Sequence, residues 1–168
     1  PLSAILFGGR RRALVPLIYE ATSWEHGVYV AATSRSEVAP GSTRAAGALY
    51  NDPMGMLPFC SYNMADYFGH WLRLGSQLIR PPHIFHVNWF RSDERGRLLW
   101  PGFGENIRVL DWVLQRVERR IDARRTPIGC VPHALDTNGL DLDADTLDRL
   151  LQVDVRGWLQ EAEVSGEF

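Results

Sequence analysis

Lysine is absent from this sequence of 168 residues, and all 18 of its basic residues are arginine. The chain therefore has no lysine that could bind phosphate in a Walker A motif, form a Schiff base or ligate a metal. Any phosphate that this chain holds must contact arginine guanidinium groups, backbone N–H groups or helix N-termini.

Cysteine, excess charge and long apolar runs are also scarce. The two cysteines, Cys60 and Cys130, are too few for a disulfide framework or a four-cysteine zinc site, so we expect a cytoplasmic protein. The formal net charge of −2 argues against a general nucleic-acid binder, because such proteins carry a clear basic excess. No apolar run reaches the roughly 18 residues of a membrane-crossing helix, and no signal peptide is visible, so we expect no membrane partner.

The order of apolar and turn-forming segments predicts one domain of α/β or mixed α+β architecture. A buried strand is predicted at 4–7, a strand or edge segment at 15–20, and further strands at 83–90 and 126–131. Helices are predicted at 63–74, 107–121, 144–151 and 155–162, and 24–32 fits either state. Segment 33–48 is rich in small residues, which predicts a mobile loop. Because residue 1 is proline and an apolar run begins at residue 4, we expect a piece of a longer protein.

Two of the predicted helices have an apolar face. In the first, Asn63 can cap the start and Gly75 the end, and the face comprises Met64, Tyr67, Phe68, Trp71 and Leu72. In the second, the face comprises Leu110, Val113, Leu114, Val117 and Ile121.

The segment with the richest chemistry begins at a predicted strand end, Trp89-Phe90, and continues in an aromatic loop at 100–106. Gly102 and Gly104 flank Phe103, so its ring can project and the backbone can approach a ligand closely. A flat heteroaromatic ring could lie between Phe90 and Phe103, with Asn106 reading its edge. The alternative is that the aromatic residues belong to the core and Asn106 only caps the following helix.

A second candidate segment is Phe7-Gly8-Gly9-Arg10-Arg11-Arg12, a strand followed by two glycines and three arginines. Its guanidinium groups could bind phosphate or carboxylate oxygens, and Arg10 is best placed to point into a cleft. The alternative is a solvated charge run after a turn.

No metal site is predicted. Alternating aspartates at 141, 143 and 145 lack the central glycine and distal glutamate of a calcium loop, which favours a solvated approach to a helix. No histidines stand at His-x-x-x-His spacing. We expect core or half-buried positions for His26, His70 and His86, and surface positions for His83 and His133.

Many ordered segments closely resemble GTP-dependent phosphoenolpyruvate carboxykinase, from residue 2 to about residue 133. They are Phe7–Arg11, Val15–Ala21, His26–Val28, Arg35–Glu37, Asp52–Pro53, Phe85–Arg91, Leu99–Asn106, Arg108–Trp112 and Thr126–Gly129. The resemblance implies an incomplete C-terminal nucleotide-binding lobe of that fold. Residues 1–168 would form part of its nucleotide-binding and lid domain, and the substrate lobe and phosphate-binding loop would lie upstream.

The resemblance also implies an activity: conversion of oxaloacetate and GTP to phosphoenolpyruvate, CO₂ and GDP in gluconeogenesis, by an enzyme that is monomeric at full length. This reaction uses Mn²⁺ at the active site and a nucleotide-bound Mg²⁺ or Mn²⁺, whose ligands are not in this chain. No catalytic residue is assigned to the chain, so the isolated fragment is predicted to be inactive.

By the same resemblance, the guanine pocket comprises the positions of Trp89, Phe90 and Phe103. Asn106 would contact the base, and the run Gly102-Phe103-Gly104-Glu105-Asn106 would line the nucleotide site. Arg10 would contact the phosphates, and Arg35-Ser36-Glu37 would begin the mobile lid. Leu98 replaces one aromatic residue of the family's pocket, and the lid run at 38–43 departs from the family's pattern.

Two other functions remain open from the sequence. One is a non-catalytic module that binds guanine nucleotides. The other is a nucleic-acid binder that uses Arg10–Arg12 and exposed aromatic residues, which the net charge opposes.

Overall fold

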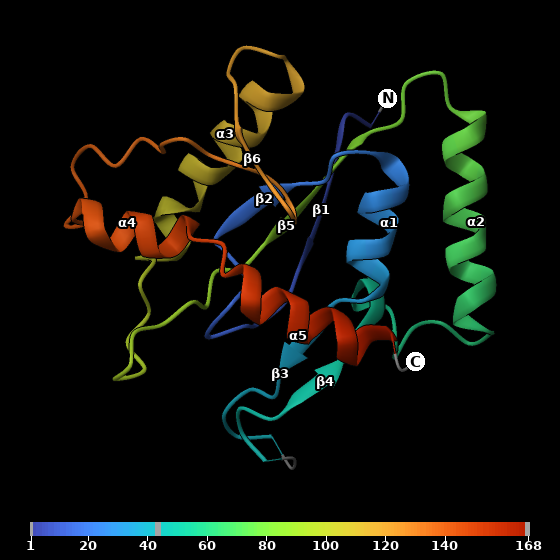
Figure 1. The fold of residues 1–168 in the computed structure, drawn as a ribbon, viewed down its shortest axis with the longest axis horizontal. Helices are drawn as coiled ribbons and strands as arrows, with labels where there is room; N and C mark the ends of the chain where they lie inside the picture. The colour runs from blue at the N-terminus through green and yellow to red at the C-terminus, as the bar shows by residue number, and fades with distance from the viewer. Residues whose placement is uncertain (1, 43–44, 167–168) are drawn as a thin grey trace.

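The computed structural model describes residues 2–42 and 45–166, and it shows a mixed α/β fold built on a five-stranded sheet (Figure 1). The strand order is β1 (Ala4–Gly8), β5 (His83–Val87), β2 (Ile18–Glu20), β7 (Gly129–Val131) and β6 (Arg124–Thr126). β1 and β5 run parallel, and the other neighbours are antiparallel. The predicted fold class is confirmed.

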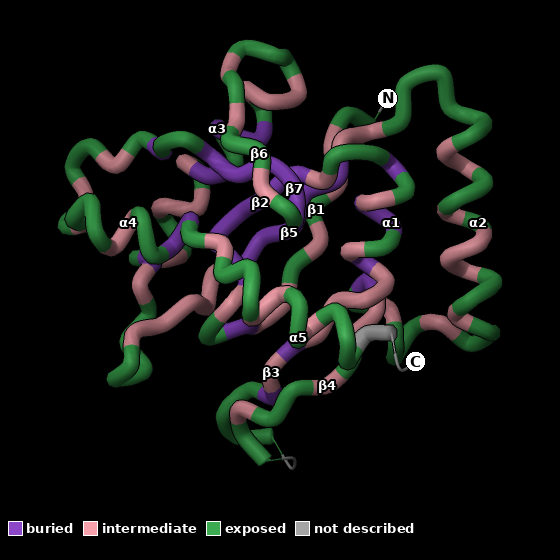
Figure 2. Tube along the Cα trace, in the orientation of Figure 1, coloured by how far each residue is buried: buried purple, intermediate pink, exposed green. Residues whose placement is uncertain are grey.

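Helices cover both faces of this sheet. On one face lie α1 (Trp24–Ala32) and α5 (Val155–Gly166), and on the other lie α3 (Asn106–Val117) and α4 (Ala144–Leu151). Alternation along β5 separates the two layers, because Ile84 packs with α1 and its neighbour Phe85 packs with Trp112 of α3. Figure 2 shows the buried segments gathered on the central strands.

Helix α2 (Met64–Gln77) packs outside α1 and has no fully buried residue. Asn63 caps its start as predicted, since its side chain accepts a hydrogen bond from Ala65 N at 2.8 Å. Trp71 stacks on Trp24 with ring centroids 5.6 Å apart. Leu72 of the predicted face is 45% exposed instead, and Leu74 joins the cluster around Trp24.

Gly75 does not end α2, contrary to the prediction. The helix continues to Gln77, and a Cβ on Gly75 would lie 2.2 Å from Cδ1 of Trp24. The glycine is therefore required for close helix packing rather than for a cap.

The buried face of α3 differs from the predicted face. Val109, Trp112 and Val113 are buried, whereas Leu110 and Leu114 are 38% and 56% exposed. The helix carries apolar residues on two adjacent stripes, and the large Trp112 ring packs inward on Phe85. The helix also ends at Val117, so the predicted helical span to residue 121 is too long.

Several strand predictions need correction. Residues 15–17 are buried but unpaired in the sheet, because Leu17 N donates to Leu150 O, so β2 begins only at Ile18. Strand β1 lies at the sheet edge and is half-exposed rather than buried. The predicted strand at 126–131 spans the last residue of β6, a turn at residues 127 and 128, and β7, whose first residue Gly129 has φ +129°.

The predicted mobile loop at 33–48 contains a strand. β3 (Arg35–Glu37) pairs with β4 (Leu49–Asn51), and the described residues between them, 38–42 and 45–48, project away from the main sheet (Figure 1). Residues 43 and 44 of the predicted loop, and residue 1 at the predicted cut end, lie outside the described residues.

Segment 24–32 is a helix, α4 has the predicted bounds, and α5 runs four residues beyond the predicted 162, to Gly166. Two short 3-10 turns, Pro53–Gly55 and Phe103–Glu105, complete the elements. Among the described residues, no helix is long and apolar enough to cross a membrane.

Candidate functional site

The candidate site starts where β1 and β5 end. These parallel strands finish in register, Gly8 beside Val87, so the segments that follow leave the sheet side by side. Asn88, which follows β5, is fully buried and hydrogen-bonds to the segment that follows β1. Its Nδ2 donates to the carbonyl oxygens of Arg11 and Val15 at 2.8 and 2.9 Å, and its Oδ1 accepts from Arg11 N at 3.2 Å.

This arrangement brings Arg10 onto Phe90. The Arg10 Cζ atom lies 3.8 Å from the centroid of the Phe90 ring, a cation–π contact. The structure gives Arg10 no ion pair with any residue it describes. Two residues predicted from separate segments are thus neighbours, and no carboxylate in the described part of the chain neutralises the Arg10 charge.

The other two arginines of the run are paired with carboxylates. Arg11 is 6% exposed and forms a two-pronged contact with Glu161, at 2.6 and 3.2 Å. Arg12 donates from Nε to Glu37 Oε2 at 2.6 Å. The prediction of a solvated charge run is therefore wrong for Arg11, which is a buried structural residue.

Phe103 lies on the surface. Its side chain is 98% exposed, and Gly102 before it has φ +92°, a left-handed conformation that favours glycine. The alternative prediction that the aromatic residues all belong to the core is wrong for Phe103. It holds for Trp100, which is 1% exposed, while Trp89 and Phe90 are half-buried.

Asn106 does not cap α3. It is the first helical residue, and Glu105 occupies the cap position without a side-chain bond to the backbone. The Asn106 Oδ1 atom accepts from Trp100 Nε1 at 2.9 Å. Because an indole N–H can only donate, this contact fixes the amide orientation. The Nδ2 group is left as a donor, and none of the described residues accepts a hydrogen bond from it.

Glu105 and Gly104 complete the loop. Glu105 accepts from Arg108 Nε at 2.6 Å, and Arg108 also donates to the carbonyl oxygens of Asp136 and Asn138. These contacts anchor the loop to α3 and to the segment before α4. A Cβ on Gly104 would meet no atom within 4 Å, so the loop surface is open there.

The predicted lid residues contact the arginine run. Ser36 Oγ accepts from Arg10 N at 3.0 Å, Glu37 binds Arg12, and the Arg35 guanidinium lies 3.6 Å from Glu161. The structure therefore brings β3 and the arginine run together. It does not bring Phe103 into contact with Phe90, since Phe103 is almost fully exposed.

Three of the five histidines have the predicted burial, and His70 and His83 do not. His86 is buried and His26 half-buried as expected, whereas His70 is exposed. His83 is not a free surface residue, because its Nδ1 lies 2.6 Å from Glu20 Oε1. His133 is exposed as expected.

Burial sets the protonation of two groups beneath the site. Burial and the nearby Arg11 guanidinium lower the pKa of His86 from 6.5 to about 4. Burial raises the pKa of Tyr19, whose ring stacks on His86 with centroids 5.3 Å apart. Both groups are therefore neutral near pH 7.

Two residues that organise the site are missing from the sequence prediction. Asn88 interrupts an apolar strand run, and a polar residue at such a place could have been suspected. Glu161 lies 150 residues from Arg11, and no local signal identifies that pairing. Asp143 caps α4 by accepting from Thr146 N, as expected for a helix approach. In the described part of the chain, no three His, Cys, Asp or Glu side chains form a group that could hold a metal ion.

The fold is a mixed α/β domain, and the candidate site places Arg10 and Phe90 together just after the parallel strands β1 and β5. The family described as phosphoenolpyruvate carboxykinase C-terminal P-loop domain matches residues 1–168. The chain belongs to this family, as its resemblance predicted.

Curated relatives agree with this assignment. The chain is 51% identical over 168 residues to a protein of Chlamydia trachomatis and 49% identical over 168 residues to one of Neocallimastix frontalis. It is 45% identical over 161 residues to a protein of Thermoplasma volcanium. All three are named phosphoenolpyruvate carboxykinase (GTP), and the matches cover 98%, 97% and 96% of this chain. The chain spans only 28%, 28% and 27% of the length of these relatives.

Proposed function

We propose that this chain supplies the guanine-nucleotide pocket and lid of an enzyme that converts oxaloacetate and GTP to phosphoenolpyruvate, CO₂ and GDP. Residues 1–168 would form part of its C-terminal nucleotide-binding and lid domain. The observation that carries the proposal is an exposed Phe103 between two glycines, on the same chain as a Phe90 ring that contacts Arg10, which forms no ion pair with the described residues.

The base would stack on Phe90 and Phe103, with Trp89 beside them. Base–aromatic stacking contributes about 1–3 kcal/mol per base. A solvent-exposed phenyl ring gains most from such a ligand, because the ring is otherwise in water. Stacking alone does not select a base, since every base has a π-face.

Asn106 would supply the selectivity. Its Oδ1 accepts from Trp100, and its Nδ2 group would donate to the ligand. Guanine presents the acceptor O6 where adenine presents an amino donor. A donor at this position therefore favours GTP over ATP, because adenine would leave two donors facing each other.

Arg10 would bind the phosphates. Its guanidinium lies against the ring proposed for the base, so one nucleotide can contact both groups. Arginine binds phosphate oxygens with paired N–H donors and neutralises charge during phosphoryl transfer. Ser36 and Glu37 of β3 hold the backbone of Arg10 and the side chain of Arg12. Movement of the proposed lid would therefore be transmitted to the phosphate contact.

The proposed reaction uses Mn²⁺ and a nucleotide-bound Mg²⁺ or Mn²⁺. The described residues do not fit either metal, because they form no group of His, Cys, Asp and Glu that could hold one. This chain's own contribution would be to bind and orient the nucleotide and to exclude water, which are positioning effects. The proposal includes a gluconeogenic role in the cytoplasm, a monomeric full-length enzyme and no nucleic-acid partner.

The proposal can be tested with the pure 168-residue chain and the full-length enzyme. With GTP, oxaloacetate and Mn²⁺, the full-length enzyme should form phosphoenolpyruvate and the chain alone should not. Titration calorimetry on the full-length enzyme should give a lower dissociation constant for GTP than for ATP. Equal affinities would contradict the role of Asn106, and turnover by the chain alone would contradict a purely binding role.

A further inference from the structure

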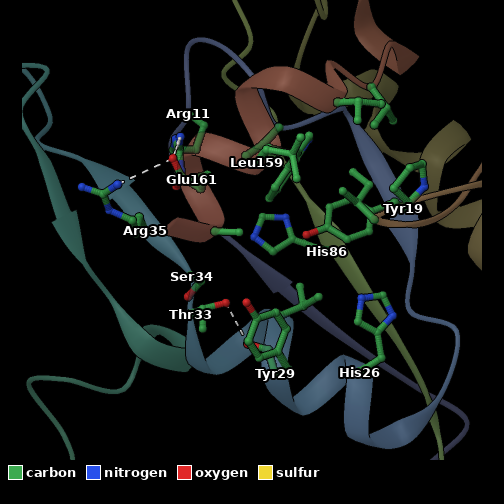
Figure 3. A pocket seen from close by; sticks show the side chains of 18 residues that line it. Arg11, Tyr19, His26, Tyr29, Thr33, Ser34, Arg35, His86, Leu159 and Glu161 are labelled. Atoms are coloured by element: carbon green, nitrogen blue, oxygen red, sulfur yellow. Dashed lines mark hydrogen bonds and ion pairs between the residues drawn. The ribbon is translucent and has the colours of Figure 1, made fainter. Parts of the chain in front are cut away.

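Glu161 of α5 contacts two arginines from other parts of the chain. Its carboxylate oxygens accept hydrogen bonds from the two terminal nitrogens of Arg11 at 2.6 and 3.2 Å. Its Oε2 atom also lies 3.6 Å from a terminal nitrogen of Arg35, the first residue of β3. Figure 3 shows the Glu161 carboxylate beside Arg11, with the Arg35 guanidinium facing it. One carboxylate of α5 therefore contacts both the arginine run and the start of the proposed lid.

These ion pairs are largely shielded from water. The side chains of Arg11, Glu161 and Arg35 are 7%, 14% and 18% exposed. Among the described residues, Glu161 provides the only carboxylate that pairs with Arg11. Because a buried charge without a partner is strongly unfavourable, the position of Arg11 depends on the Glu161 carboxylate.

The Arg10 backbone lies between the two groups that this carboxylate contacts. On one side, a single peptide bond joins Arg10 to Arg11. On the other side, Arg10 N donates to Ser36 Oγ at 3.0 Å, and Arg10 O accepts from Glu37 N at 2.7 Å. Ser36 and Glu37 are the second and third residues of β3. A change in either contact of Glu161 would therefore shift the backbone of Arg10.

We propose that Glu161 is a positioning residue of the nucleotide site and acts on the phosphates through Arg10. By holding Arg11 and Arg35, it keeps the Arg10 guanidinium on the Phe90 ring, 3.8 Å from the ring centroid, where the guanidinium can contact phosphate oxygens. This inference rests on the proposed function, because it takes Arg10 to be the phosphate ligand. It adds that α5 sets the affinity for the phosphates but not for the base.

Replacing Glu161 by glutamine in the full-length enzyme removes the charge and keeps the size of the side chain. Movement of the uncompensated Arg11 toward water would displace Arg10. The GTP dissociation constant should rise about tenfold, as expected for loss of a hydrogen bond to a charged group. Guanosine, which has the base but no phosphate, should bind as before. Titration calorimetry measures GTP binding, and NMR titration measures guanosine binding.

Glu163→Gln is the matched control. Glu163 lies on the same helix, is exposed and forms no ion pair with the described residues. This variant should leave both dissociation constants unchanged. If Glu161→Gln weakens guanosine binding as much as GTP binding, Glu161 supports the domain in general and the proposal is wrong.

A double-mutant cycle tests whether Glu161 acts through Arg10. Arg10→Gln alone should raise the GTP dissociation constant at least tenfold. Adding Glu161→Gln should then raise it by no more than about twofold, because the Arg10 contact is already lost. Losses that multiply would overturn the proposal, since Glu161 would then act elsewhere.

The single variants separate this proposal from the proposed function. Unchanged GTP binding in Arg10→Gln would contradict the phosphate role of Arg10 and the role of Glu161 with it. Weaker binding in Arg10→Gln together with unchanged binding in Glu161→Gln would overturn the positioning role alone.

Glu161→Asp provides the test if the glutamine variant does not fold. It keeps the charge that compensates Arg11 and draws the carboxylate back by one methylene group, so the contacts lengthen. GTP affinity should fall, guanosine affinity should stay the same, and the difference should disappear when Arg10→Gln is added. A GTP dissociation constant equal to that of the unaltered enzyme would overturn the proposal.

Discussion

Replacing Phe103 by alanine in the full-length enzyme should weaken GTP binding without changing the free energy of unfolding. The side chain is 98% exposed and contributes no core packing. Substitutions at such positions usually change the free energy of unfolding by no more than about 0.5 kcal/mol. Any larger effect on GTP binding must then come from contact with the ligand.

The expected effect on binding follows from the stacking energy. Loss of one base–aromatic contact costs about 1–3 kcal/mol, which raises the dissociation constant for GTP by about five- to 150-fold. Titration calorimetry with GTP measures this change, and thermal unfolding checks that stability is unaltered. Phe103→Trp should retain most of the affinity, because it keeps a π-face.

Phe59→Ala is the matched control. Phe59 is also a surface phenylalanine, 75% exposed, and lies outside the proposed pocket. Its replacement should leave the GTP dissociation constant unchanged. If Phe103→Ala binds GTP as tightly as the unaltered enzyme, Phe103 does not stack on the base and the proposed pocket is wrong.

Three further predictions concern selectivity, pH and packing. Asn106→Asp keeps an oxygen for Trp100 but loses the N–H donor, so competition titration should show GTP affinity falling about tenfold and ATP affinity falling less. The pKa of His86 is lowered from 6.5 to about 4, so the unfolded chain takes up this proton first as the pH falls. About 3 kcal/mol of stability should therefore be lost between pH 6.5 and 4. Denaturant unfolding should show this loss reduced in His86→Gln and retained in His133→Gln, a change at an exposed site. Gly75→Ala should destabilise the chain by about 1–3 kcal/mol, because its Cβ would overlap an indole ring at 2.2 Å. Gly69→Ala on the same helix meets only a flexible arginine end at 3.3 Å and should stabilise by up to about 1 kcal/mol in thermal unfolding.

Local patterns predicted most of the elements but not their packing. The apolar period and the Asn63 cap identified α2, because both signals lie within a few residues of each other. The buried face of α3 was predicted wrongly, since two adjacent stripes are apolar and only contact with Phe85 selects the one that carries Trp112. The parallel pairing of β1 with β5 joins segments about 75 residues apart, with no nearby residues to signal it.

Local patterns likewise identified residues of the candidate site but not the contacts between them. Composition and glycine spacing pointed to Arg10 and Phe103, and the structure confirms that Phe103 is exposed and that Arg10 contacts Phe90. The role of Asn106 as a helix cap was a reasonable prediction from its position, but Trp100 binds its oxygen instead. That contact depends on how the loop folds back on α3, which spacing does not determine.

The three consecutive arginines show how one fold gives identical side chains different environments. Arg11 faces inward and is neutralised by Glu161 of α5, and Arg12 is neutralised by Glu37 of β3. Arg10 lies on an aromatic ring, which attracts its charge without neutralising it. A phosphate that approaches this run therefore meets one cation that no carboxylate of the described residues already binds. Because Glu37 and Glu161 hold the neighbours, Arg10 is the residue of the three that can bind an anion without breaking an existing ion pair.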